Sequence, residues 1–316
     1  MTTWKSKNGL LIVSPDRGRI LQAQVGGQDA FWVNGFWRKG WNVGGDRLWV
    51  GPELSWFWKT REEVDFNRYE VQKNLDDDNW KVSHLDDKSC YVEKKINLKY
   101  QHAKGQGVRL SLERGFALSE MAAPHFARHI VYTTENKLSI REGSPGLKVD
   151  LWCITQIPAG GVVYTPYRGE SSFRNYFQPI TDDLWENRKA VMAFDITGKY
   201  QYKIGISPKI SKGRLAYVRE LGNDQYMVVY RELFSQQWRP YCDSPMDEPD
   251  SQGDVIQVYN DNGDFGGFGE FEHHSPSLTC GERNNSLTHS NVTIVGLVHK
   301  KSWNDWYRYW LVGEGD

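Results

Sequence analysis

The sequence contains few cysteines, and they lie far apart. Cys90, Cys153, Cys242 and Cys280 are the four in 316 residues, and no two of them form a CxxC pair. Cysteine-based zinc sites and disulfide-stapled domains depend on closely spaced cysteines. We therefore expect neither a structural zinc site nor a disulfide scaffold.

An excess of charge of one sign is also absent. The chain has 39 Lys and Arg against 40 Asp and Glu, which gives a formal net charge of −1. Proteins that bind nucleic acids or anionic membranes usually present a basic field to them. This balance therefore predicts neither a nucleic-acid partner nor a membrane partner.

Long hydrophobic runs are missing as well. No stretch approaches the ~20 apolar residues that a transmembrane helix needs. The early apolar run at residues 10–13 is too short for the core of a signal peptide. A cytoplasmic location is the default expectation, and a periplasmic or secreted one applies if a signal peptide has been removed.

Aromatic residues, in contrast, are plentiful. There are 14 Trp, 16 Tyr and 13 Phe, although only 39% of the chain is hydrophobic and the mean hydropathy is −0.65. An indole ring can cover a β core or stack on the C–H face of a sugar, and both roles stay open here. Half of the tryptophans fall within the first 58 residues, namely Trp4, Trp32, Trp37, Trp41, Trp49, Trp56 and Trp58.

Short runs of alternating apolar and polar residues, bounded by Gly, Pro, Asn and Asp, recur along the chain, and this pattern is typical of strands joined by turns. Helical windows are few and short, at residues 53–63 and 303–310, so a parallel sheet with crossover helices is not expected. We predict an all-β fold, a large antiparallel β-sandwich with few short helices, in which residues 1–316 form a single domain. The clearest strand segments are residues 18–25, 89–100, 107–117, 127–134, 148–156, 190–195, 200–206, 215–220, 226–234, 255–260, 268–274 and 291–300.

A glycine pair opens the first candidate site, at residues 44–53. Gly44 and Gly45 permit a tight turn with positive φ. Arg47 and Glu53 then supply a forked donor and a two-oxygen acceptor, a combination that can hold adjacent hydroxyl groups of a polyol. The alternative is that these two side chains bond each other or nearby carbonyl groups.

The second candidate site lies at residues 266–276. In a strand, Glu270, Glu272 and His274 project from one face, while Phe271 and His273 project from the other. Two neighbouring carboxylates repel each other, which raises the pKa of one of them unless a cation lies between them. The pattern suits a general base with a neighbouring acid, and a divalent metal ion held by Glu270, Glu272 and His274 is an alternative, as is a solvent-facing strand.

The third candidate site contains two histidines. His125 and His129 share a face if their segment is extended, and an imidazole group is a natural proton donor near neutral pH. A structural role for each histidine is the alternative. Common catalytic motifs such as GxSxG, GxxxxGK and HExxH are absent, and residues 261–264 are expected to form a turn rather than a calcium loop.

The order of these segments resembles bacterial proteins of the galactose mutarotase-like (aldose 1-epimerase-like) superfamily. The resemblance spans roughly residues 15–300 and depends on the order of the motifs more than on any single one. The sequence departs from the epimerases in lacking their Asn-His-x-Tyr-Phe-Asn motif. The matching segments are residues 44–49, Pro52 and Glu53, and residues 151–156, 203–208, 258–261 and 269–276.

This resemblance implies a supersandwich that binds a carbohydrate on its concave face, with possible isomerase chemistry on sugar anomers. Glu272 or Glu270 would be the base, and His125 or His129 the acid. No cofactor is required beyond the alternative metal ion, and the partner is a small-molecule carbohydrate. A non-catalytic carbohydrate-binding protein, and a lyase or hydrolase on the same scaffold, stay open. The residues expected to contact the sugar are Arg47, Glu53, Trp49, Trp152, Gln156, Lys203 and His129, with Trp49 and Trp152 stacking on it.

Overall fold

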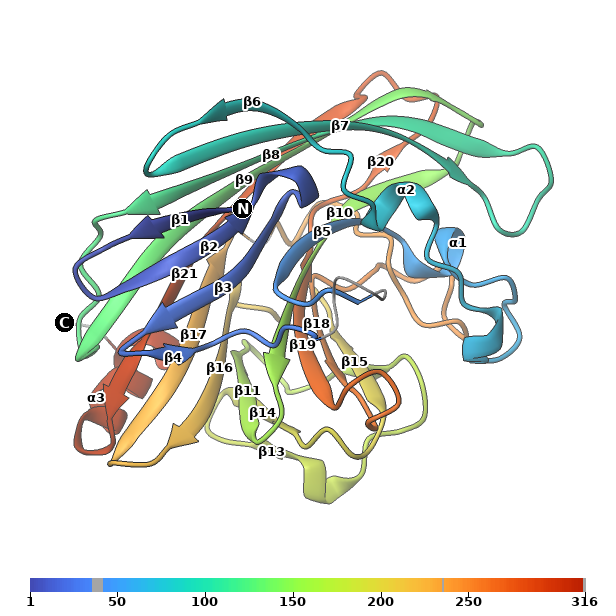
Figure 1. Ribbon diagram of the computed structural model, residues 1–316. Coiled ribbons are helices and arrows are strands. Elements are labelled where there is room, and N and C mark those ends of the chain that lie inside the picture. Colours follow the sequence, from blue (N-terminus) through green and yellow to red (C-terminus); the bar gives the residue numbers. More distant parts are fainter. Residues whose placement is uncertain (36–41, 235, 315–316) are drawn as a thin grey trace.

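The protein folds into two large antiparallel β-sheets, as the alternating pattern predicts. The computed structural model describes residues 1–35, 42–234 and 236–314, and Figure 1 shows the two sheets packed face to face. Trp37 and Trp41 lie outside the described residues. The prediction of an all-β sandwich with few short helices is confirmed.

The first sheet has 11 strands within the described part of the chain, and its main path runs in the order β1-β2-β3-β5-β10-β19-β18-β15-β12. The remaining two strands, β4 and β20, pair with β3 and β10. The strands of this sheet are β1 (Thr2–Lys5), β2 (Gly9–Ser14), β3 (Arg19–Val25), β4 (Gln28–Asp29), β5 (Asp46–Gly51), β10 (Lys148–Pro158), β12 (Arg174–Asn175), β15 (Tyr202–Ile206), β18 (Ile256–Asn260), β19 (Phe268–His274) and β20 (Leu278–Thr279).

The second sheet has 10 strands among the described residues, in the order β13-β14-β11-β16-β17-β21-β9-β8-β7-β6. Several of its strands are long, and β9 alone covers 16 residues. The strands of this sheet are β6 (Lys81–Leu85), β7 (Ser89–Lys99), β8 (Gly107–Ser119), β9 (Arg128–Gly143), β11 (Gly161–Pro166), β13 (Trp185–Asn187), β14 (Val191–Ile196), β16 (Arg214–Leu221), β17 (Gln225–Leu233) and β21 (Ser286–His299).

The helices are short and lie outside the sandwich. In Figure 1, α1 and α2 lie on the right beside the first sheet, whereas α3 lies at the far left beside the second. None of the helices in the described ranges is long and apolar enough to cross a membrane. The helical segments are α1 (Glu53–Trp56), α2 (Lys73–Asp76), α3 (Trp303–Tyr307), the 3₁₀ turns η1 (Pro15–Arg17), η2 (Phe66–Arg68), η3 (Asp182–Leu184) and η4 (Lys300–Ser302), and the π-helical turn η5 (Arg308–Val312).

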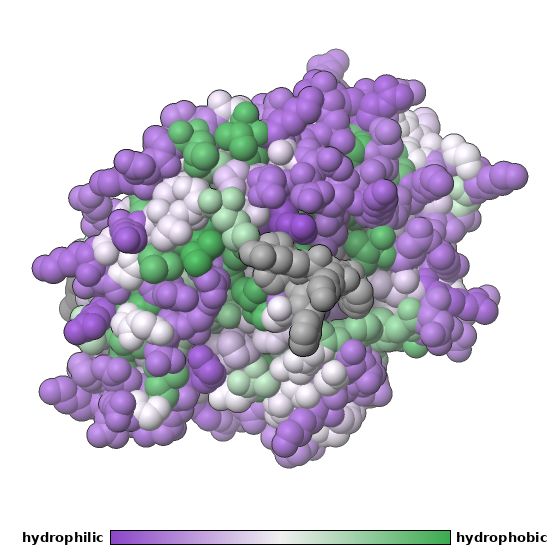
Figure 2. Space-filling model, viewed as in Figure 1, coloured by the Kyte–Doolittle hydropathy of each residue, from purple (hydrophilic) through white to green (hydrophobic). Residues whose placement is uncertain are grey.

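The main hydrophobic core lies between the two sheets, where alternate residues of facing strands meet. Leu48 and Phe271 of the first sheet and Leu112 and Tyr132 of the second belong to it. A smaller apolar cluster covers the outer face of the second sheet, and it includes Val131 of β9 and Trp306 of α3. Figure 2 shows that hydrophilic residues cover most of the visible surface.

Candidate functional site

Strand alternation separates the residues of the first sheet into two faces. Cys153 and Phe271 face the second sheet, because Asn136 of β9 bonds the Sγ of Cys153 at 3.6 Å and the Arg231 guanidinium lies 4.8 Å from the Phe271 ring. Their neighbours Trp152 and Glu272 therefore face away from the second sheet. This outward face of β5, β10, β19, β18 and β15 carries the candidate site.

The glycine pair before β5 makes the turn that the sequence predicts. Gly44 and Gly45 have φ values of 91° and 76°. A Cβ at Gly45 would lie 2.3 Å from the carbonyl oxygen of Ile20, so a side chain has no room there. The turn brings β5 beside β10, with Arg47 opposite Ile154 and Trp49 opposite Trp152.

A pocket of about 510 Å³, part of it open to solvent, lies against this face; we call it the inner pocket. Ligand sites typically combine apolar walls with a few convergent polar groups. Eight of the lining residues in the described part of the chain are aromatic. The lining consists of Asn42, Arg47, Trp49, Glu53, Phe66, Tyr69, Trp152, Gln156, Phe177, Lys203, Tyr259, Phe265, Phe268 and Glu270.

One polar group in the inner pocket is centred on Glu270. The Nη2 of Arg47 lies 2.9 Å from the Oε1 of Glu270, and Gln156 donates from Nε2 to the same oxygen at 2.6 Å. The guanidinium of Arg47 also lies 3.9 Å from the centroid of the Trp49 ring. Arg47 of β5 therefore pairs with Glu270 of β19, which lies on the other side of β10, and not with Glu53 as the alternative interpretation supposed.

A second polar group is centred on Lys203. Its Nζ lies 2.8 Å from the Oε2 of Glu53 and 3.3 Å from the Oε2 of Glu272. The indole N–H of Trp152 donates to the same Glu272 oxygen at 2.5 Å. Glu272 is fully buried and lies beneath the inner pocket, whereas Glu270, two residues earlier, lines it.

Burial raises the pKa of Glu272 to about 7, and the neighbouring carboxylates of Glu270 and Glu53 act in the same direction against the opposing effect of Lys203. The raised pKa follows from burying Glu272 near two other carboxylates while it shares one ammonium group, that of Lys203, with Glu53. Burial lowers the pKa of His274, but Asp150 and Asp243 outweigh it and hold that pKa above its usual value.

The raised pKa of Glu272 predicts a pH-dependent effect of Glu272→Gln. The pKa of Glu272 is 4.5 in the unfolded chain and about 7 in the folded protein. Proton binding to the folded protein therefore contributes its full stabilisation below pH 4.5, and this contribution is lost as the pH rises through 7. We expect the wild type to lose up to about 3 kcal/mol relative to Glu272→Gln between pH 5 and pH 8. Urea unfolding at both pH values measures this difference, Glu63→Gln is the exposed control, and a pH-independent difference would contradict the prediction.

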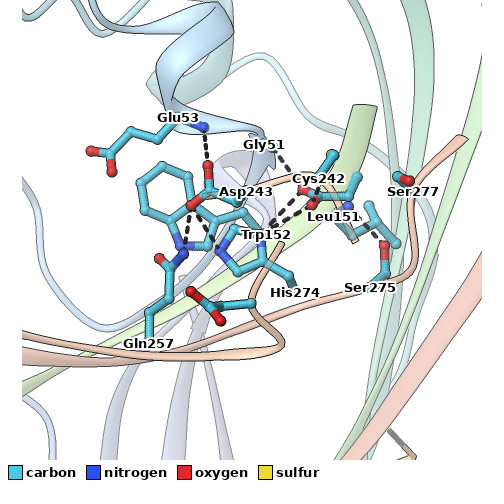
Figure 3. Close-up of polar contacts among 12 residues, drawn as sticks. Gly51, Glu53, Leu151, Trp152, Cys242, Asp243, Gln257, His274, Ser275 and Ser277 are labelled. Atoms are coloured by element: carbon cyan, nitrogen blue, oxygen red, sulfur yellow. Dashed lines mark hydrogen bonds and ion pairs between the residues drawn. The ribbon is translucent and has the colours of Figure 1, made fainter. Parts of the chain in front are cut away.

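A buried layer beneath the pocket holds Glu53 and Trp152 in place, as Figure 3 shows. Pro52 offers no side-chain cap to α1, and the backbone N–H of Glu53 instead donates to Asp243 at 2.5 Å. Gln257 donates to the other oxygen of Asp243. The His274 ring stacks on Trp152 at 5.7 Å.

His274 is directed toward two carboxylates and not toward the inner pocket. Its Nδ1 lies 3.2 Å from Asp150, and its Nε2 lies 3.7 Å from Asp243. In residues 1–35, 42–234 and 236–314, no three His, Cys, Asp or Glu side chains are grouped so that they could hold a metal ion. Glu270, Glu272 and His274 thus share a face but engage Arg47, Lys203 and Asp150 separately, which corrects the expectation of a metal ion among them.

The expectation that Trp49 and Trp152 stack on a ligand also needs correction. Trp49 is 3% exposed and Trp152 is 2% exposed. Trp49 packs with Arg47 and stacks on Phe57 at 5.2 Å, while Trp152 stacks on His274 and lies 4.5 Å from the Nζ of Lys203. Both indoles line the inner pocket, but their faces are engaged by protein groups.

The partly exposed rings of the pocket come from loops. Phe66 of η2 lies 5.5 Å from Phe177 and 5.6 Å from Phe265, and all three are partly exposed. Tyr69 lies beside them, 5.9 Å from Phe66. The sequence patterns did not single out these four residues or Asn42, because loop residues carry no periodic signal. Tyr259 of β18 and Phe268 of β19 also line the pocket; they lie in predicted strands, but nothing in their pattern marked them as site residues.

His125 and His129 lie away from the inner pocket. His125 is exposed in a turn with a φ of 66°, and its ring contacts Tyr309 of η5 at 5.5 Å. His129 is on the same face of β9 as Val131, which belongs to the outer cluster beneath α3. The second sheet and the core therefore separate both histidines from Glu272, so the expected pairing of acid and base is wrong.

Comparison with known proteins gives a family and a fold. The family of unknown function DUF6786 matches residues 6–301. A search of curated proteins found no match to the chain. Three solved structures with a similar fold share at most 11% sequence identity with the chain. At this identity they show the galactose mutarotase-like fold alone.

A candidate aldose 1-epimerase from Escherichia coli K12 has a TM-score of 0.53 and 11% identity, over 94% of this chain and 98% of that chain. A galactose mutarotase-like protein from Lactobacillus casei has a TM-score of 0.51 and 10% identity, over 93% of this chain and 99% of that chain. A galactose mutarotase related enzyme from Lactobacillus acidophilus has a TM-score of 0.50 and 7% identity, over 93% and 96%.

Proposed function

The chain belongs to the DUF6786 family of unknown function, and from that premise we propose that it binds a sugar or sugar derivative in the inner pocket. The observation that carries the proposal is the convergence of charged and amide side chains in a pocket walled by aromatic rings. Aromatic faces suit the C–H surfaces of a pyranose ring, and fixed donors and acceptors suit its hydroxyl groups.

The charges of the inner pocket favour an uncharged ligand. Arg47 is paired with Glu270 and Lys203 is paired with Glu53, so neither cation offers an uncompensated charge to an anionic ligand. Paired ions nevertheless keep hydrogen-bonding positions free, since a guanidinium carries five N–H donors and a carboxylate accepts at two oxygens. Neighbouring hydroxyl groups of a neutral sugar can use both kinds of position.

The proposal is tested by measuring the binding of glucose, galactose, mannose, xylose and arabinose by calorimetry and ligand-observed NMR. We expect at least one of them to bind, and Glu270→Gln to weaken its binding about 10-fold or more, because the variant removes a charged acceptor and the partner of Arg47. Glu63→Gln, an exposed control, should bind like the wild type. Absence of binding across the panel, or full affinity in Glu270→Gln, would contradict the proposal.

A second candidate function is acid–base interconversion of sugar anomers. It is favoured by the placement of a carboxylate, Glu270, and a phenol, Tyr69, in the lining of the same pocket. Glu270 would take the proton of the anomeric hydroxyl, and Tyr69 would protonate the ring oxygen, so that the ring opens and recloses on either face.

Polarimetry of freshly dissolved aldoses tests this second function. The wild-type protein should accelerate the approach to anomeric equilibrium, and Glu270→Gln should not. Unchanged rates for every sugar that binds would leave binding as the function.

A further inference from the structure

A second cavity adjoins the inner pocket and extends it. This outer cavity has a volume of about 570 Å³, and it shares Phe66, Tyr69 and Phe265 with the inner pocket. On the basis of the proposed function, we infer that the outer cavity is a second sugar subsite and that the ligand is a saccharide of two or more rings. Its other described lining residues are Arg17, Val43, Glu70, Val71, Lys73, Asp76 and Asp77.

The two cavities meet across a small group of side chains. Phe66 contacts both Phe265 and Tyr69, and all three rings line both cavities. On the side of the sheet, the indole N–H of Trp49 donates to Asp76 at 3.1 Å, so that a wall residue of the inner pocket is bonded directly to a wall residue of the outer cavity. The two cavities are therefore adjacent, and a second ring attached to a sugar in the inner pocket would lie beside these shared side chains.

The outer cavity has the chemistry of a sugar subsite. The shared rings give it an apolar surface, and each is partly exposed, as a stacking platform must be. The polar lining carries charges of both signs: Arg17 and Lys73 are basic, and Glu70, Asp76 and Asp77 are acidic. This mixture offers donors and acceptors to hydroxyl groups without the one-signed charge that an anionic ligand would need.

Two of its polar residues differ in how firmly they are held. Asp76 accepts from Arg19 at 2.5 Å as well as from Trp49, so its carboxylate is fixed in orientation. Lys73 is exposed, and its ammonium group forms no ion pair or hydrogen bond with other side chains in the described part of the chain. Its ammonium group is therefore the donor that can be removed with least disturbance of the fold.

The test compares single sugars with their dimers. Calorimetry on the full chain measures the affinities for glucose, galactose and mannose and compares them with the affinities for maltose, cellobiose, lactose and mannobiose. We expect one disaccharide to bind about 10-fold or more tightly than its monosaccharide, because a second ring adds stacking and hydroxyl contacts. Lys73→Ala should remove a large part of this gain and leave monosaccharide affinity unchanged.

A blocking variant and a control complete the test. Val71→Trp adds bulk to the outer cavity and should abolish the gain, and Lys95→Ala, an exposed lysine of β7, should keep it. Equal affinities for disaccharides and monosaccharides, or a gain that survives in both Lys73→Ala and Val71→Trp, would overturn the subsite. Absence of binding by every saccharide would instead overturn the proposed function, and the subsite with it.

Discussion

Replacing Asp46 by alanine is expected to cost about 3–5 kcal/mol of unfolding free energy. Asp46 is 1% exposed and lies between the two sheets, where it pairs with Arg114 and with Arg231, the latter at 2.5 Å. Tyr132 and Thr155 also donate to it, at 3.0 and 3.3 Å. Its removal leaves two buried guanidinium groups without their carboxylate, a loss comparable with the ~5–15 kcal/mol total stability of a typical domain.

Urea unfolding followed by tryptophan fluorescence measures this cost. Asp87→Ala, an exposed position, should change the unfolding free energy by less than about 0.5 kcal/mol. The triple variant Asp46→Leu, Arg114→Met, Arg231→Met should recover much of the loss, because replacing a whole buried ionic group by apolar residues is often neutral. If Asp46→Ala alone costs less than about 1 kcal/mol, Asp46 is not the compensating charge of this cluster.

This cluster also shows what sequence patterns can and cannot predict. Alternation predicts that Asp46 and Arg47 point to opposite faces of one strand, and they do. It does not predict which face meets the core, and a buried Asp beside Arg114 and Arg231 is an exception to apolar patterning. Their pairing spans 68 and 185 residues, a separation for which one sequence carries no signal.

The candidate site was predictable to a similar degree. Seven of the residues expected to act on a sugar line the inner pocket, because the motif order brings Arg47, Gln156 and Glu270 onto adjacent strands. His125 and His129 lie elsewhere because His129 belongs to β9 of the second sheet, on the face turned away from the core, and His125 lies in a turn with positive φ just before that strand. The partly exposed rings of the pocket were not predicted for another reason. Phe66, Phe177 and Phe265 lie on three separate loops, and only the folded chain brings these loops together.

The last and largest functional effect is expected from Lys203→Met. Lys203 is 2% exposed and is the cation shared by Glu53 and Glu272. Methionine matches its length but leaves both carboxylates unpaired and removes an N–H donor from the wall of the inner pocket. We expect affinity for the panel aldose that binds best to fall about 100-fold, as for loss of hydrogen bonds to a charged group.

The same variant should lose about 3 kcal/mol of unfolding free energy at pH 8 and less at pH 5, where Glu272 binds a proton and only one carboxylate is unpaired. Adding Glu272→Gln to Lys203→Met should restore much of the stability at pH 8, because it removes the uncompensated buried charge, and should not restore the affinity. Lys199→Met, at an exposed position, should change neither quantity. Recovery of affinity together with stability in the double variant would mean that Lys203 supports the fold of the inner pocket and does not contact the ligand; loss of affinity with stability restored assigns the ammonium group to the binding site.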